Sequence, residues 1–171
     1  MPIGPEPSVD PNSTARRLCA IFERIRRQRM TGLPILHPGL SVAVIGARQW
    51  GSDWTGVLVT PWCMNLVLIP GSGSDTGRGP IGSKQVRALP AGDFEFIASE
   101  EIGIGPFAAC SLFSPMQVFA DQAAAIATAE SVIRELFQPR PDSARDARPE
   151  GERDLGLSRR SLLLGSRRGN R

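Results

Sequence analysis

The sequence predicts an α+β fold, in which a mostly antiparallel sheet of about five strands is flanked by an N-terminal and a C-terminal helix. Apolar residues recur at helical spacing near residue 20 and again near residue 130. Short segments rich in β-branched, aromatic or aliphatic residues fill the interval between them. The connections between these segments are too short for crossover helices, which favours antiparallel pairing of strands. One sheet with helices packed on a face is the architecture that results.

The first helix is expected to begin at Asn12 or Ser13, because either side chain can accept a free backbone N–H at a helix start. Gly32 and Pro34 are expected to end it. Its apolar face is made of Leu18, Ile21, Phe22 and Ile25. Arginines fill the opposite face, which we interpret either as a solvated surface or as a docking surface for an acidic partner.

Five segments between residues 40 and 113 are predicted strands, because turn residues separate them. They are Leu40–Ala47, Trp54–Thr60, Met64–Ile69, Phe94–Ala98 and Phe107–Phe113. Residues 71–83 (GSGSDTGRGPIGS) are expected to form a flexible insertion or a hairpin loop. A second helix is predicted from about Asp121, which caps it, to Phe137, before Pro139 and Pro141 stop it.

Residues 12–138 therefore form a single predicted α+β domain. Residues 1–11 contain four prolines and are expected to be a flexible leader that does not resemble a secretory signal. Residues 139–171 are expected to be a flexible, disordered and Arg-rich tail, because the stretch 138–158 is too polar to bury. No apolar run approaches the roughly 18 to 20 residues that a membrane span needs.

Charge is unevenly distributed along the chain. Residues 13–30 hold six Arg and one Glu, and residues 155–171 hold five Arg and no acid, whereas residues 31–138 hold nine acids and five bases. Of the 20 basic residues, 19 are Arg. Arg favours bidentate contacts with carboxylate or phosphate groups, although high-GC codon usage produces the same bias. The basic flanks are therefore compatible with an acidic protein partner, a nucleic acid or an anionic membrane.

The chain offers little for catalysis or metal binding. Cys19, Cys63 and Cys110 are scattered, and with His37 they match no zinc-binding spacing, which suits buried thiols in a reducing cytoplasm. A cysteine hydrolase would require Cys63 and His37 to meet, with a third group to orient them. Residues 77–84 resemble a P-loop, but one serine separates the lysine from the last glycine. No catalytic residue, metal or cofactor is predicted.

Three tryptophans, Trp50, Trp54 and Trp62, lie within thirteen residues of one another. Each is compatible with core packing, but Trp62 stands at a strand start, where an indole can pack while its N–H stays in water. Met116 follows a strand at another turn, and methionine suits surfaces that hold varied partners. Exposed Trp and Met side chains at these turns are predicted to anchor a partner.

The tail contains the segment SRRSLLLG at residues 158–165, which looks like a twin-arginine export signal. An export signal requires an N-terminal position and a longer apolar region than three leucines. We therefore interpret this segment either as a tail that docks on another surface or as a solvated chain end.

Short motifs stand in order from about residue 13 to residue 165. They are His37-Pro38, Trp54-Thr55-Gly56, Thr60-Pro61-Trp62, Pro70-Gly71, Leu89-Pro90-Ala91-Gly92 with Phe94 and Phe96, Ser111-Leu112, Ser114-Pro115-Met116 and Ser158-Arg159-Arg160-Ser161-Leu162-Leu163-Leu164-Gly165. Each motif is weak alone, but the ordered set is fairly specific. With these motifs the sequence resembles the HybE/HupJ/HoxT family of nickel–iron hydrogenase assembly chaperones.

The resemblance implies a non-enzymatic, cytoplasmic chaperone that binds small or large precursor subunits of a nickel–iron hydrogenase before twin-arginine export. Some family members act beside a rubredoxin-like protein, and this chain, lacking rubredoxin cysteine pairs, would need that partner in trans. The residues expected to contact a partner are Trp54, Thr60, Pro61, Trp62, Ser114, Pro115, Met116, Arg159 and Arg160.

An alternative function is that of a basic adaptor that binds nucleic acid or an anionic membrane surface. Phosphate contacts from the basic flanks would make such binding strongly dependent on salt. The predicted strands offer no clear aromatic platform on which bases stack, because Tyr is absent and the tryptophans cluster. Neither a nucleic-acid partner nor stable membrane insertion is therefore expected.

Overall fold

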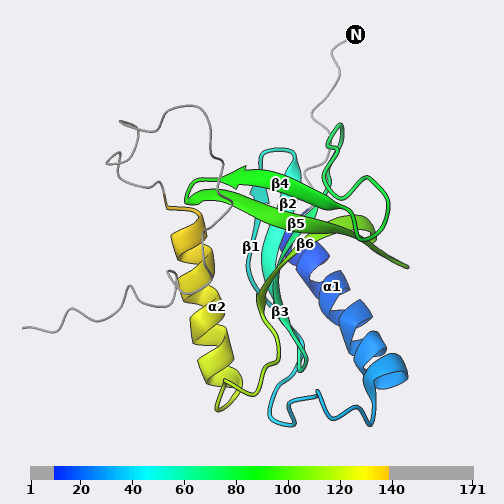
Figure 1. Ribbon diagram of the computed structural model, residues 1–171, viewed down its shortest axis with the longest axis vertical. Coiled ribbons are helices and arrows are strands. Elements are labelled where there is room, and N and C mark those ends of the chain that lie inside the picture. The colour runs from blue at the N-terminus through cyan, green and yellow to red at the C-terminus, as the bar shows by residue number, and fades with distance from the viewer. Residues whose placement is uncertain (1–9, 139–171) are drawn as a thin grey trace, which may run out of the picture.

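The computed structural model describes residues 10–138, where two α-helices lie on opposite faces of one antiparallel sheet (Figure 1). The helices are α1 (Pro11–Ile25), continued by the π-helical turn η1 (Arg26–Met30), and α2 (Gln122–Leu136). The strands are β1 (Ala43–Trp50), β2 (Asp53–Val59), β3 (Met64–Ile69), β4 (Lys84–Leu89), β5 (Gly92–Glu101) and β6 (Gly105–Phe113). The predicted α+β class is confirmed, with six strands in the described part instead of about five.

The sheet consists of two meanders joined side by side. Its order is β1-β2-β3-β6-β5-β4, so each run of three strands is connected by hairpins, and β3 pairs with β6 at the centre. All neighbouring strands are antiparallel. Strands β1 and β4 form the two edges of the sheet.

Strand β4 is the element that the sequence analysis missed. Its sequence, KQVRAL, has one β-branched residue and no apolar run, and its strand form depends on pairing with β5. Residues 71–83 accordingly connect the central strand β3 to the edge strand β4, so the hairpin interpretation is wrong. Two side-chain bonds tie this connection down: Thr76 Oγ1 donates to Asp53 Oδ2 at 2.6 Å, and the Gly77 N–H donates to Gln85 Oε1 at 3.0 Å.

Both helices begin at aspartate caps. The Asp10 carboxylate accepts the Asn12 N–H at 3.1 Å, which starts α1 at Pro11, slightly earlier than expected. Proline is favoured at this position, because its missing N–H would have no partner inside the helix. The predicted cap of α2 is confirmed, with Asp121 Oδ1 accepting the Ala124 N–H at 2.8 Å.

Strand β1 is displaced by three residues from its predicted range of 40–47. The pairing between β1 and β2 shifts between Ile45 and Arg48, and Gly46 lies there with a φ of 68°. Glycine adopts this left-handed conformation without a Cβ clash, so the strand bulges and continues to Trp50. A Cβ at Gly46 would lie 2.8 Å from Ile133, so the glycine also permits close packing of α2.

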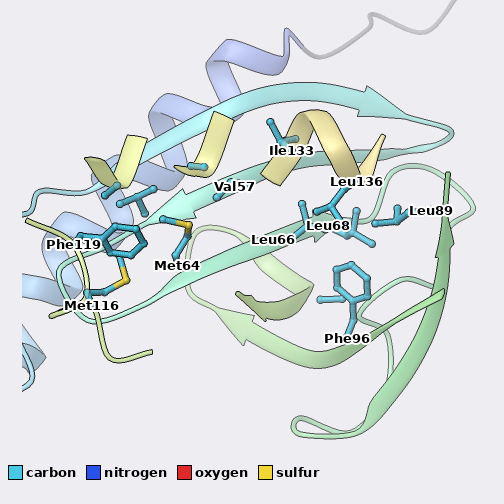
Figure 2. Close-up of a cluster of buried hydrophobic side chains, with 14 of the residues drawn as sticks. Val57, Met64, Leu66, Leu68, Leu89, Phe96, Met116, Phe119, Ile133 and Leu136 are labelled. Carbon is cyan, nitrogen blue, oxygen red and sulfur yellow. The ribbon is translucent and has the colours of Figure 1, made fainter. Parts of the chain in front are cut away.

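The core is divided by the sheet into two clusters. Beneath α2, Met64, Leu66 and Phe96 are fully buried, together with Met116 and Leu136 (Figure 2). Beneath α1, a smaller cluster is formed by Leu18, Trp54, Leu58, Val67 and Phe107. Burial of both faces of the strands β2 and β3 fixes the positions of the loops at their ends.

The α2 cap is testable by replacing Asp121 with Ala. We expect the free energy of unfolding to fall by about 1 kcal/mol, because the Ala124 N–H loses its acceptor. Urea unfolding of the full chain measures this change. The control is Glu130→Ala, on the exposed side of α2, and an equal loss in both variants would contradict the capping role.

Candidate partner-binding site

Three loops meet at one end of the sheet, the lower end in Figure 1. They comprise residues 31–42 before β1, 60–63 between β2 and β3, and 114–121 after β6. Because Met64 pairs with Phe113, the start of β3 lies beside the end of β6. We call these residues the three-loop end. The predicted contact residues Thr60, Pro61, Trp62, Ser114, Pro115 and Met116 all belong to it.

Hydrogen bonds from His37 and Gln117 link the three loops. The His37 N–H donates to the Pro61 carbonyl at 2.8 Å. His37 Nδ1 accepts the Gly39 N–H at 3.0 Å, so Nε2 carries the proton and donates to the Phe119 carbonyl at 3.0 Å. Gln117 Nε2 donates to the Ile35 carbonyl at 3.1 Å. The loops are therefore held in one arrangement before any partner binds.

Thr60 organises the turn between β2 and β3. Its hydroxyl accepts the Cys63 N–H at 2.9 Å and the Trp62 N–H at 3.3 Å, and it lies 2.9 Å from the Cys63 carbonyl. Thr60 and Pro61 are both buried. Thr60 thus holds the turn that presents Trp62, and its own side chain is not available at the surface.

The sulfur and imidazole that a cysteine hydrolase would require are engaged elsewhere. Burial raises the pKa of the Cys63 thiol, which disfavours the thiolate. The Cys63 Sγ lies 3.4 Å from the Thr60 hydroxyl and 3.5 Å from Asn65 Nδ2. Both ring nitrogens of His37 bond to backbone groups.

Exposed apolar side chains surround the three-loop end. Trp62 is half-buried and stacks on Phe22 of α1, with ring centroids 6.5 Å apart. Leu33, Ile35 and Val118 are 45%, 39% and 70% exposed. Ser114 and Pro115 are exposed as well. The sequence analysis did not single out Leu33, Ile35 and Val118 as contact residues. The available signal was their position as apolar residues within turn-rich segments.

Besides the buried Thr60 and Pro61, two more of the predicted contact residues are buried, and both belong to the hydrophobic clusters. Met116 is 0% exposed and belongs to the cluster beneath α2, so it packs the loop and presents no side chain to a partner (Figure 2). Trp54 is 5% exposed, and its indole N–H donates to the Pro11 carbonyl at 2.9 Å. It lies in β2 at the end away from Thr60 and anchors the start of α1. Arg159 and Arg160 lie outside the described residues, as do the predicted tail and residues 1–9 of the predicted leader. The last two residues of that leader are not flexible, because Asp10 caps α1 and Pro11 begins it.

The arginine face of α1 and η1 is partly neutralised. Arg26 and Arg27 bond to Glu23, at 2.6 and 3.2 Å, and the hydrogen bonds from Arg26 lower the pKa of the Glu23 carboxyl. Arg29 makes a bidentate pair with Glu101, at 2.9 and 3.1 Å. Most arginines of this face therefore already form ion pairs within the protein, although their side chains remain largely exposed to water.

Residues 10–138 contain neither a metal-binding cluster nor a membrane-spanning helix. No group of three or more His, Cys, Asp or Glu residues in this range is placed to share a metal ion. No helix in the same range is long and apolar enough to cross a membrane. The thiols of Cys19 and Cys63 form no disulfide bond within this range.

Comparison with known proteins gives consistent matches. The family model described as [NiFe]-hydrogenase assembly, chaperone, HybE matches residues 13–165. The hydrogenase expression/formation protein HupJ of Bradyrhizobium diazoefficiens is 38% identical over 162 residues, covering 95% of this chain and 94% of that protein. A protein of Rhodobacter capsulatus called probable rubredoxin HupJ is 36% identical over 121 residues, covering 71% of this chain but 44% of its own length.

A solved structure shares the fold. The solution structure of HybE from Escherichia coli superposes with a TM-score of 0.59 at 27% sequence identity, covering 91% of each chain. The family match includes all of α1 except its first two residues, and the whole of the sheet, the three-loop end and α2. The chain belongs to the HybE family of [NiFe]-hydrogenase assembly chaperones.

Proposed function

We propose that the chain is a non-catalytic chaperone that binds a precursor subunit of a nickel–iron hydrogenase in the cytoplasm, before export by the twin-arginine route. The observation that carries this proposal is the three-loop end, where exposed apolar side chains surround loops held by His37 and Gln117. Membership of a hydrogenase assembly family supports the choice of client.

Apolar contact is the proposed source of affinity. Trp62 is the expected anchor, because tryptophan is enriched among residues that dominate binding energy. Leu33, Ile35 and Val118 add apolar area, and Pro115 adds little conformational freedom. Since the loops are already ordered by internal hydrogen bonds, a client pays little to immobilise them.

Arginines are proposed to attract acidic segments of the client. Arg17 is exposed and forms no ion pair within the described residues, whereas most other arginines of α1 and η1 are paired. Arg159 and Arg160 are proposed to add to this attraction from the tail. Charges of this kind mainly accelerate encounter, while the apolar anchors determine how long the complex lasts.

A rubredoxin-like partner in trans is part of the proposal. The Rhodobacter capsulatus relative carries rubredoxin in its name, and this chain matches less than half of that protein. The proposal assigns the rubredoxin role to a separate protein that meets this chain on the same client.

Replacing Trp62 with Ala tests the proposed site. We expect binding of the hydrogenase precursor to weaken by about 1 to 3 kcal/mol, or roughly 5- to 150-fold. The measurement is recovery of precursor subunits with the tagged full chain from hydrogenase-producing cells, followed by titration with the recovered subunit. The thermal unfolding midpoint of each variant confirms that it is folded.

Trp50→Ala is the matched control for this experiment. Trp50 is 38% exposed and packs on Phe137 at the opposite end of the sheet. Equal loss of binding in the two variants, or full binding by folded Trp62→Ala, would contradict the site. Salt-sensitive binding to DNA or anionic vesicles without precursor binding would instead favour the basic adaptor.

A further inference from the structure

One face of the β4–β5 hairpin is not covered by a helix. The cross-strand partners Lys84 and Ile97, Val86 and Glu95, and Ala88 and Asp93 share this face, which we call the β4–β5 face. It lies on the α1 side of the sheet, because Ile97 also pairs with Ala109 of the cluster beneath α1. That cluster contains no residue of β4 or β5.

The β4–β5 face combines exposed apolar side chains with one excess negative charge. Val86 is 51% exposed and Ile97 is 42% exposed. Lys84 pairs with Glu95 at 3.0 Å, whereas Asp93 forms no ion pair among residues 10–138.

A pocket of about 490 Å³ extends this surface at the β5–β6 turn. Ile81 and Ile102, 72% and 80% exposed, lie in its wall. The Arg29–Glu101 pair and Glu100 complete the lining with two glycines. Within the described part of the chain Glu100 has no ion-pair partner, so the combined surface keeps two unpaired carboxylates, those of Asp93 and Glu100.

We propose that residues 158–165 of the same chain (SRRSLLLG) dock on the β4–β5 face and its adjoining pocket. This inference goes beyond the proposed function, because it concerns the chain without a client. Arg159 and Arg160 would leave the β4–β5 face when a client binds and would then be available to its acidic segments. Arg159 and Arg160 have the sign of charge that complements an unpaired carboxylate such as that of Asp93, and Arg can bind a carboxylate bidentately. The three leucines of the segment can pack on the exposed isoleucines and valine of this surface. Such packing removes apolar area of both partners from water.

The path of the chain favours this occupant. The Ala91 N–H, in the turn between β4 and β5, donates to the Leu136 carbonyl at the end of α2 at 3.1 Å. The chain therefore leaves the described region beside one end of the hairpin, as Figure 1 shows. Strand β4 is an edge strand, so a segment coming from the α2 side can pass around it to the opposite face.

The intervening chain is long enough. Residues 139–157 separate the described region from the docking segment. Nineteen residues reach at most about 65 Å when extended, whereas a domain of this size has a radius of gyration of only about 14 Å. All of the β4–β5 face is within reach of the same molecule.

Methyl NMR of the full chain, labelled at isoleucine, tests the proposal. The tail variant carries Arg159→Ala, Arg160→Ala, Leu162→Ser and Leu163→Ser together. We expect the methyl resonances of Ile81, Ile97 and Ile102 to shift in this variant. The buried methyl groups of Ile133, beneath α2 on the other side of the sheet, serve as an internal reference and are expected to stay in place.

The matched control is Arg167→Ala with Arg168→Ala, which removes a second arginine pair that no leucine follows. This control is expected to leave the three methyl resonances unchanged. Unchanged resonances in the tail variant would overturn the proposal, as would shifts confined to Ile35 at the three-loop end. Shifts that disappear on dilution would assign the docking to a second copy and would also overturn it. No client is present, so these outcomes do not depend on the proposed function.

Discussion

Replacing Met116 with Ala is expected to lower the free energy of unfolding by about 2 to 5 kcal/mol. The side chain is fully buried in the cluster that contains Met64 and Phe119 (Figure 2). Removing its thioether leaves a cavity that the sheet and α2 can close only in part, and the loss includes both transfer and cavity costs. Urea unfolding of the full chain measures the change.

Val118→Ala provides the control in the same loop. Val118 is 70% exposed, so its truncation is expected to change stability by no more than about 0.5 kcal/mol. If Met116→Ala keeps normal stability and loses the client, Met116 acts at the surface after all, and the packing role is refuted.

Replacing Gly71 with Ala is expected to lower the free energy of unfolding by about 3 kcal/mol or more, because the new methyl group collides with the backbone. A Cβ at this position would lie 1.8 Å from the carbonyl oxygen of Ser52. The Gly71 N–H also donates to Asp53 Oδ1 at 3.3 Å, so the chain cannot move away without losing that bond. Overpacking of this kind forces backbone shifts, which a lowered thermal unfolding midpoint would report.

Gly79→Ala is the control for Gly71→Ala. Its added Cβ would meet the Ser83 hydroxyl at 3.1 Å, and this end of a flexible side chain can turn aside. We expect a change within about 0.5 kcal/mol. A similar large loss of stability in both variants would show that any added side chain in the connection between β3 and β4 destabilises the fold. That result would contradict the specific role assigned to Gly71.

Local sequence signals were sufficient for the helices and most strands. Asp121 begins α2 as predicted, and β3 has its predicted bounds, because capping chemistry and apolar alternation act within a few residues. Strand β4 was missed since its form is imposed by β5. The displacement of β1 follows from the bulge at Gly46, which depends on close packing against Ile133 of α2.

The candidate site was predictable in composition but not in geometry. The motifs around Trp62 and Pro115 were singled out, but their meeting depends on the pairing of β3 with β6. A turn position does not show whether a side chain points inward, which is why Met116 was expected at the surface and lies in the core. The same limitation hid Leu33 and Val118, whose exposure depends on the packing of the three loops.

The hydrogen bonds that hold the three-loop end together affect how the sequence of this surface can change during evolution. His37 and Gln117 donate to main-chain carbonyls of Pro61, Phe119 and Ile35, and every residue type at those positions supplies the same oxygen. Side chains on the rim, such as Ile35 and Val118, can therefore be exchanged while the scaffold under them is preserved. Recognition of a new binding partner is thus open to single substitutions on the rim, with no need to rebuild the loops.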